Sequence, residues 1–186
     1  VNGKCIVHNC PKLSDTECTI RILRSLGCVV RREGNTVTVD ATTVSCSNIP
    51  EDLMREMRSS VVFLGAIVGR TGEATLCAPG GCEIGLRPID LHLYAVRRLG
   101  VTVDECHGNI TCRVKDKLKG DKITFSFPSV GATENALLLA VTAKGNTTIV
   151  NAAREPEITD LCSFLNSCGA RISGAGESII TVEGVD

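Results

Sequence analysis

The residue best suited to covalent or acid–base chemistry in this sequence is Cys82, which lies in a glycine-rich segment. The segment CAPGGCEIGLRP (residues 77–88) places this cysteine directly after two glycines and shortly before Arg87. Glycines keep a side chain from burial, and a nearby arginine and helix N-terminus lower the pKa of a thiol and favour thiolate. From spacing alone, a sharp glycine-rich turn with an incidental cysteine is an equally good interpretation. The segment matches neither a P-loop nor Gly-x-Gly-x-x-Gly, so its glycines do not predict a nucleotide-phosphate site.

Three arginines are candidates for binding a phosphate or a carboxylate, because a guanidinium group can donate two parallel hydrogen bonds to either. They are Arg58, Arg87 and Arg154. Each could equally be a solvated surface charge, and the adjacent Glu155 favours a structural role for Arg154.

A helix N-terminus is expected at residues 129–133 (SVGAT), where spare backbone N–H groups could bind an anion or a carbonyl oxygen. Ordinary capping by Ser129 is the alternative. His92 stands one turn into the helix expected after Arg87, and a structural role is the simpler interpretation there. His8 and His107 are assigned no role.

The composition is that of a soluble globular protein. Of the 186 residues, 43% are hydrophobic and 22% are charged, and the net charge is −1, so binding to bulk nucleic acid or to an anionic membrane is not expected. The longest apolar runs, such as residues 61–68, are too short to span a bilayer. The N-terminal residues show no secretion signal, so we expect a cytoplasmic protein.

The cysteines do not form the pattern of a disulfide framework or of a metal site. There are 11 of them, an odd number, with no Cys-x-x-Cys spacing. Several, including Cys28, Cys112 and Cys168, stand at core-like positions, which favours buried packing residues in a reduced protein. We therefore expect no metal ion and no cofactor.

A unit of about seventy residues repeats along the chain, and its reference points are Gly27, Gly100 and Gly169. Apolar residues precede each glycine at helical spacing, so each glycine is expected to end an amphipathic helix. A strand with alternating apolar residues, a glycine turn and a second strand then follow each time. Each unit is thus predicted to contain a helix followed by a β-hairpin.

A second repeated element opens at Gly3, Gly72 and Gly145, each of which begins a strand. The strands are expected at residues 4–7, 73–77 and 146–150, and more apolar helices at residues 53–68 and 132–143 precede the second and third of them. No such helix precedes Gly3 in this sequence, which favours a piece of a longer polypeptide over a naturally truncated repeat.

The predicted fold is an α/β inside-out barrel, or α/β prism, of three βαβαββ units with helices inside and sheets outside. The first unit lacks its leading helix. Residues 1–186 are expected to form a single domain, with units at approximately residues 1–68, 69–143 and 144–186.

Five segments together resemble the UDP-N-acetylglucosamine enolpyruvyl transferase family. They are residues 79–92 (PGGCEIGLRPIDLH), 128–133 (PSVGAT), 151–158 (NAAREPEI), 57–60 (MRSS) and 11–15 (PKLSD). The resemblance covers nearly the whole chain and implies most of one domain of a two-domain enzyme, with the active site between the domains. It implies enolpyruvyl transfer from phosphoenolpyruvate to the 3-hydroxyl of UDP-N-acetylglucosamine with release of phosphate, the first committed step of peptidoglycan synthesis.

The resemblance also implies roles for particular residues. Cys82 would be the general acid at the methylene carbon of phosphoenolpyruvate, would form a covalent adduct with it, and would be the thiol that fosfomycin alkylates. Arg87 would bind phosphate and close the loop, and Arg58 would contact the UDP-sugar. The remaining positions implied to bind the nucleotide sugar are Pro88, Ile89, Asp90, Leu91, Phe127, Pro128, Ser129, Val130 and Gly131, of which Phe127 is lysine in some relatives.

The resemblance also implies what this sequence does not contain. The family's Lys-Asn pair, which binds phosphoenolpyruvate, would lie before Gly3, and its catalytic aspartate and further arginines would lie in a second domain of the same polypeptide. We therefore expect no transferase activity from this chain alone. The alternatives are a non-catalytic UDP-sugar-binding domain or paralogue and a shikimate-type enolpyruvyl transferase, a group that lacks the Cys82 segment.

Overall fold

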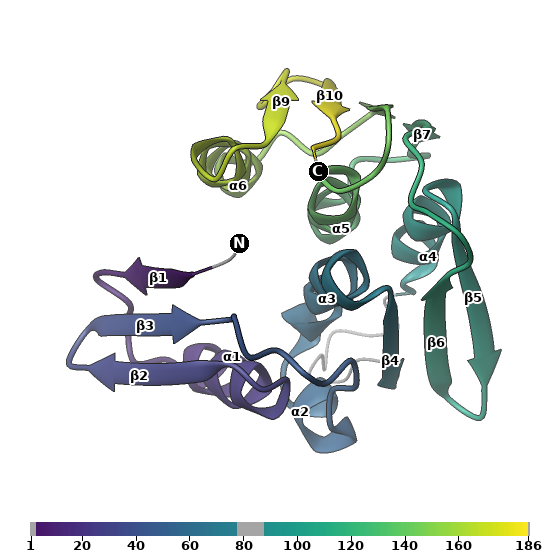
Figure 1. Ribbon diagram of the computed structural model, residues 1–186. Helices are drawn as coiled ribbons and strands as arrows, with labels where there is room; N and C mark the ends of the chain where they lie inside the picture. Colours follow the sequence, from purple (N-terminus) through teal and green to yellow (C-terminus); the bar gives the residue numbers. More distant parts are fainter. Residues whose placement is uncertain (1–2, 78–87, 186) are drawn as a thin grey trace.

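The computed structural model describes residues 3–77 and 88–185, which form three small β-sheets arranged around a central group of helices (Figure 1). The strands are β1 (Lys4–Val7), β2 (Val29–Glu33), β3 (Thr36–Asp40), β4 (Glu73–Cys77), β5 (Val101–Cys106), β6 (Asn109–Val114), β7 (Lys122–Thr124), β8 (Asn146–Val150), β9 (Arg171–Ser173) and β10 (Ile179–Glu183). The helices are α1 (Ser14–Ser25), α2 (Glu51–Glu56), the 3-10 helix η1 (Arg58–Val62), α3 (Phe63–Thr71), α4 (Asp90–Arg98), α5 (Val130–Ala140) and α6 (Pro156–Ser167). No helix in these described ranges is long and apolar enough to cross a bilayer.

The predicted repeat is present in the structure. The units β1–α1–β2–β3, β4–α4–β5–β6 and β8–α6–β9–β10 give sheets with the same strand order, in which the last strand of the unit pairs with both others. The glycines that follow α1, α4 and α6 have φ angles of 96°, 93° and 100°, a backbone conformation that side chains with a Cβ disfavour. Each helix therefore stops at the same point of the repeat and returns the chain into a hairpin.

Helix α5 forms the centre of the core. Its buried residues face in all directions around the helix, as expected for an inner helix of the prism. Helix α3 packs directly against it, since a Cβ at Gly65 would lie 2.6 Å from the backbone oxygen of Asn135. The glycine is needed because the two backbones approach so closely, and the α/β prism prediction is confirmed.

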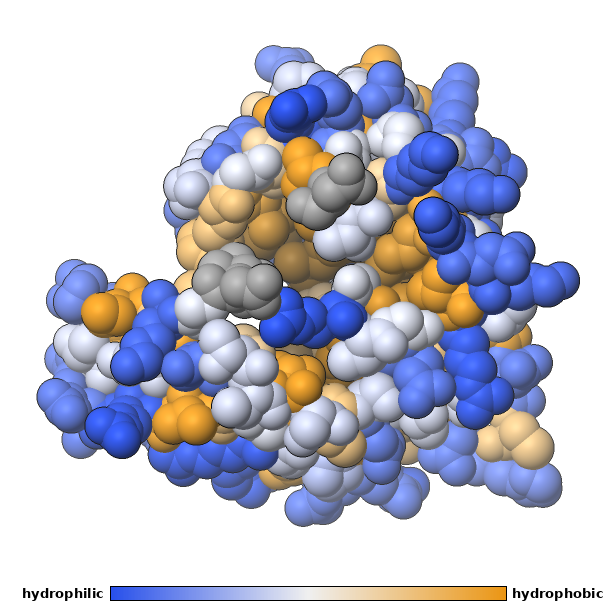
Figure 2. All heavy atoms as spheres, viewed as in Figure 1, coloured by the Kyte–Doolittle hydropathy of each residue, from blue (hydrophilic) through white to orange (hydrophobic). Residues whose placement is uncertain are grey.

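The first sheet is covered less completely than the other two. Its buried residues form a separate small cluster with α1, made of Ile20, Cys28, Val30 and Val37. Val7 lies on the same face of the sheet as Val37 but is 49% exposed. Figure 2 shows apolar residues deep in the hollow between α6 and this sheet.

Two expectations from the sequence are wrong in detail, and one strand was not expected. The single helix expected at residues 53–68 is divided into α2, η1 and α3, because Met57 is extended (φ −131°, ψ 119°) and buried in the core. Cys168 is exposed, since it is the C-terminal capping residue of α6 and not part of its buried stripe. Strand β7, which pairs in parallel with β8, was not expected because three residues are too few for a recognisable alternation.

Candidate active site

The starts of several helices meet at one pocket, which has a volume of about 500 Å³. The first turns of α1, α4 and α5 contribute to it, together with η1. We call it the Arg58 pocket, and its lining residues are Asp15, Glu56, Met57, Arg58, Ser59, Val61, Val62, His92, Val130, Gly131 and Glu134. Because the N-terminal end of a helix carries partial positive charge and unpaired N–H groups, such a convergence suits an anionic ligand.

The start of α5 is fixed by two side chains. The Ala132 N–H donates to Ser129 Oγ over 3.4 Å, and the Thr133 hydroxyl donates to the Ser129 carbonyl oxygen over 2.8 Å. The Ala153 N–H in turn donates to Thr133 Oγ1 over 3.1 Å, which ties the helix to the segment after β8. Val130 and Gly131 precede the first intrahelical hydrogen bond, so their N–H groups have no acceptor within the helix. Ser129 therefore caps this helix start, and the cap leaves the Val130 and Gly131 N–H groups without an acceptor in the helix.

Arg58 reaches the pocket because the chain breaks its helix just before it. After the extended residue Met57, η1 begins at Arg58, and the buried Ser60 hydroxyl donates to the Met54 carbonyl oxygen over 3.2 Å. Arg58 itself is half-buried. A continuous helix would place this side chain in a different direction relative to α2, so the break determines which residues face the pocket.

A buried hydrogen-bond network joins three helices behind the pocket. Asn135 on α5 accepts a hydrogen bond from the Gly65 N–H on α3 over 2.6 Å. Its amide nitrogen donates to the Val61 carbonyl oxygen over 3.0 Å. Asn135 Nδ2 also lies 2.8 Å from Nδ1 of His92 on α4. Asn135 is fully buried and His92 is 7% exposed, so these are interior contacts. Such a network holds α3, α4 and α5 in register at the floor of the pocket.

The electrostatics of the pocket are mixed. Burial, together with the positive charge of Arg58, lowers the pKa of His92 to about 4, so the ring is neutral at physiological pH. Burial also raises the pKa of the Glu134 carboxyl, and the nearby Glu157 adds to that shift. The carboxylate of Glu56 is paired with Arg21.

The structure places most of the residues implied by the sequence resemblance at this end of the molecule. Arg58, Val130 and Gly131 line the pocket, and Ser129 caps the helix beside it. Phe127 is 58% exposed and Pro128 is exposed, so both present apolar surface next to the pocket.

At the start of α4, Pro88 and Asp90 are exposed, whereas Ile89 and Leu91 are half-buried and pack against the core. None of these four residues lines the Arg58 pocket itself. Cys82 and Arg87 lie outside the described residues, and their assigned roles stay predictions.

Sequence reasoning missed His92 as a pocket residue and Asn135 as its partner. The signal for His92 was its position one turn after Arg87, but a lone histidine in a helix is usually structural. Asn135 lies in the apolar run of α5, where its polarity was the only available indication.

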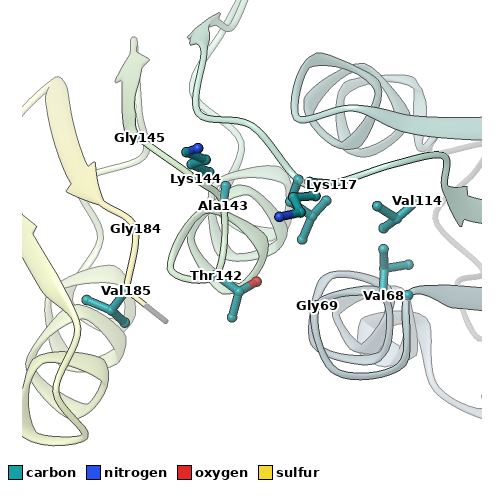
Figure 3. Close-up of a pocket in the computed structure, with 12 residues that line it drawn as sticks. Val68, Gly69, Val114, Lys117, Thr142, Ala143, Lys144, Gly145, Gly184 and Val185 are labelled. Carbon is teal, nitrogen blue, oxygen red and sulfur yellow. The ribbon is translucent and has the colours of Figure 1, made fainter.

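A second, larger pocket of about 720 Å³ lies where α3 and α5 end (Figure 3). Its titratable side chains are those of Lys117 and Lys144, and the segment after α5 meets the end of the chain there. Backbone hydrogen bonds join Lys144 to Leu118 and Val185 to Val141, as in a packing junction. With fewer converging functional groups and the negative ends of two helices, it is the weaker candidate.

Solved structures identify the class of protein to which this arrangement belongs. The enolpyruvyl transferase NikO from Streptomyces tendae matches the whole chain with a TM-score of 0.86 and 27% sequence identity, over 43% of its own length. EPSP synthase from Acinetobacter baumannii matches with a TM-score of 0.76 at 16% identity, which shows the fold alone. The architecture is that of one domain of an enolpyruvyl transferase.

The chain belongs to the EPSP synthase (3-phosphoshikimate 1-carboxyvinyltransferase) family, whose model matches residues 1–186. Among curated proteins, UDP-N-acetylglucosamine 1-carboxyvinyltransferase 2 of Caldanaerobacter subterraneus subsp. tengcongensis is 50% identical over 183 residues, or 98% of this chain. UDP-N-acetylglucosamine 1-carboxyvinyltransferase of Solidesulfovibrio magneticus is 48% identical over 182 residues. The resemblance predicted from the motifs is confirmed, and the chain spans 44% of the length of each of these relatives.

Proposed function

We propose that this chain forms one wall of the active site of an enolpyruvyl transferase acting on phosphoenolpyruvate and UDP-N-acetylglucosamine. The observation that carries the proposal is the Arg58 pocket, which gathers Arg58, Val130 and Gly131 from separate segments of the chain. These are among the residues that the sequence resemblance assigns to the nucleotide sugar. Curated relatives that are 43–50% identical and carry the matching name support the choice of sugar.

The geometry suggests how the nucleotide sugar would bind. The Val130 and Gly131 N–H groups at the start of α5 and the guanidinium of Arg58 would hold the diphosphate. The exposed ring of Phe127 and the adjacent Pro128 would flank the uracil, since both offer apolar surface beside the helix start. Pro88, Ile89, Asp90 and Leu91, at the start of α4, would complete the nucleotide-binding side.

The proposed chemistry uses the segment before α4. Cys82 would donate a proton to the methylene carbon of phosphoenolpyruvate, which leaves positive charge at the neighbouring carbon. The sugar 3-hydroxyl would attack that carbon and lose its proton, and loss of phosphate and of a methyl proton would restore the double bond. Arg87 would stabilise the departing phosphate. No metal ion or cofactor takes part in these steps as proposed.

This reaction is the first committed step of peptidoglycan synthesis, which would place the protein in the cytoplasm with a role in cell-wall formation, cell shape and division. Fosfomycin would alkylate Cys82. A second domain of the same polypeptide would supply the opposite wall of the site, because the relatives are more than twice as long as this chain.

A second candidate function is binding of the UDP-sugar without turnover. The chain spans 44% of the length of a curated relative, so it would form only one wall of the cleft. One wall alone would stabilise the charge of the transition state incompletely, which favours binding without turnover for the isolated chain. A shikimate-type activity is the weaker alternative, because the structural match to EPSP synthase at 16% identity speaks only for the fold.

Calorimetric titration of the chain with UDP-N-acetylglucosamine and, separately, with shikimate 3-phosphate tests the proposal. We expect binding of the nucleotide sugar alone, and about a tenfold or greater loss of affinity in Arg58→Met, since a hydrogen bond to a charged group contributes about 1.5–3 kcal/mol. Arg154→Met, a change of an exposed arginine outside the pocket, is the matched control and should bind normally. Binding of shikimate 3-phosphate but not of the UDP-sugar would refute the substrate assignment.

The role of Cys82 has its own test. Mass spectrometry after fosfomycin treatment should show one label, on the peptide that contains Cys82. Phosphate release from the two substrates by the isolated chain should be undetectable. Labels spread evenly over several cysteines would contradict a specifically reactive thiol, and measurable turnover would contradict the need for a second wall.

A further inference from the structure

The ring of His92 spans the distance between the buried network and the Arg58 pocket. Its Nδ1 faces Asn135 at 2.8 Å, whereas the opposite edge of the ring lies against the first turn of α5. A Cβ built on Gly131 would stand 2.8 Å from His92 Cε1 and 3.3 Å from Nε2. Both His92 and Gly131 line the pocket, and Asn135 does not. The ring therefore turns one nitrogen to the core and the other toward the side where a ligand would lie.

The protonation of the ring follows from the orientation of the Asn135 amide. The Gly65 N–H can only donate, so it requires the amide oxygen, and the Val61 carbonyl can only accept, so it requires the amide nitrogen. The amide cannot be reversed without losing both bonds. Asn135 Nδ2 is thus the group that faces His92, and Nδ1 of the neutral ring must accept. The single ring proton consequently sits on Nε2.

A structural role in the buried network accounts for the contact between Nδ1 and Asn135, but it does not require the Nε2 edge to lie at the pocket. The absence of a side chain at Gly131 lets the Nε2 edge lie against the first turn of α5, where the Val130 and Gly131 N–H groups have no acceptor within the helix, and the positive charge of Arg58 acts on the ring. Three carboxylates line the same pocket, those of Asp15, Glu56 and Glu134. Glu56 is paired with Arg21, and Glu134 Oε2 lies 4.0 Å from the Cβ position of Gly131, on the side of α5 that the ring edge faces.

We propose that His92 is a ligand-binding residue whose Nε2–H, held in place by Asn135, donates a hydrogen bond to a phosphate oxygen of the nucleotide sugar in the Arg58 pocket. This inference rests on the proposed function, because it takes the nucleotide sugar as the ligand. Asn135 acts as a positioning residue, since it fixes the proton on Nε2 without touching the ligand.

Two substitutions at His92 separate a donor from a space-filling residue. In His92→Gln the side-chain amide nitrogen can occupy the place of Nε2 and donate, whereas in His92→Met no donor remains. With UDP-N-acetylglucosamine as the probe, we expect the Gln variant to bind within about threefold of the unchanged chain and the Met variant at least about tenfold more weakly. His8→Met, at an exposed histidine that does not line the pocket, is the matched control.

Asn135→Asp tests the positioning role without changing His92. The carboxylate still accepts from the Gly65 N–H but cannot donate, so the ring proton should move to Nδ1 and leave Nε2 as an acceptor. The ¹⁵N chemical shifts of the His92 ring, assigned by comparison with His92→Gln, should report this exchange of protonated and unprotonated nitrogens. We expect affinity to fall about as far as in His92→Met.

The outcomes distinguish this inference from the proposed function. If the unchanged chain does not bind the nucleotide sugar, the proposed function fails, and the inference fails with it. If it binds and the Gln and Met variants, both folded by circular dichroism, have equal affinity, only the role of His92 is refuted. A ring proton found on Nδ1 in the unchanged chain would also refute it.

Discussion

The contact between α3 and α5 makes a sharp prediction, because the two helices meet where a single glycine leaves room for a backbone. In Gly65→Ala the new Cβ would lie 2.6 Å from the Asn135 backbone oxygen and 2.8 Å from its side-chain oxygen. Ordinary contact begins at 3.4 Å, so the helices must separate by about 0.8 Å at this point. The atom in the way belongs to the backbone of a buried helix and cannot rotate aside.

The expected loss of stability follows from two opposing effects. Forcing an extra carbon into a packed core costs about 1–3 kcal/mol, whereas alanine gains up to about 1 kcal/mol over glycine inside a helix. We expect a net decrease of about 1–2 kcal/mol in the free energy of unfolding. For a chain of this size the decrease corresponds to a melting temperature lower by about 2–8 °C.

The assay is urea denaturation followed by circular dichroism, with Gly69→Ala as the matched control on the same helix. A Cβ at Gly69 would meet the Thr142 hydroxyl at 3.3 Å, the Leu138 carbonyl oxygen at 3.5 Å and Leu139 Cδ1 at 3.7 Å. A side-chain hydroxyl can turn away, so Gly69→Ala should be as stable as the unchanged chain or slightly more so. Equal stability of the two variants would refute the close approach of α3 and α5.

Three further predictions concern titration, buried hydrogen bonds and thiols. The pKa of His92 is lowered from 6.5 to about 4 in the folded chain, so between these pH values the unfolded chain binds more protons than the folded chain. The contribution of His92 to the free energy of unfolding should therefore decrease by about 3 kcal/mol from pH 7 to pH 4. His92→Gln should remove that part of the slope in denaturation curves, and identical slopes would contradict it. Thr133→Val leaves the Ala153 N–H without its partner and should cost about 1–3 kcal/mol in the same assay, whereas Thr142→Val, at an exposed threonine, should cost little. Burial raises the pKa of the Cys112 thiol to about 11, and it also raises the pKa of four other thiols, those of Cys18, Cys28, Cys77 and Cys162. Mass spectrometry after brief treatment with a thiol reagent should therefore find the exposed Cys106 and Cys168 modified before these five. Early modification of Cys112 would contradict its buried position.

Much of the fold could be predicted because its signals are local. The strands at residues 4–7, 73–77 and 146–150 have the predicted bounds, and the glycines that end α1, α4 and α6 stand where the repeat placed them. Helical spacing and glycine conformation depend on near neighbours in the chain, so a single sequence displays them. The helix break at Met57 could not be predicted from the sequence, because no local pattern indicates it. Met57 is extended, and its side chain is buried in the core.

In the candidate site, too, the sequence predicted the residues that belong to local motifs but not the contacts between distant residues. Arg58, Val130 and Gly131 were predicted from motifs, and the structure brings them into one pocket. The hydrogen bond between His92 and Asn135 joins residues 43 positions apart, and that between Gly65 and Asn135 joins residues 70 positions apart. Local spacing carries no information about such pairs.

The sequence by itself determined the repeat, the alternation of helices and strands, and the family to which the chain belongs. Only the tertiary structure decided which helix starts share a pocket, which side chain faces Nδ1 of His92, and which glycine the helices need at their closest contact. The physical reason is that hydrogen-bond direction and steric fit depend on how distant segments meet in space. The first set of properties is present in each short segment of the chain, and the second arises only when the segments pack together.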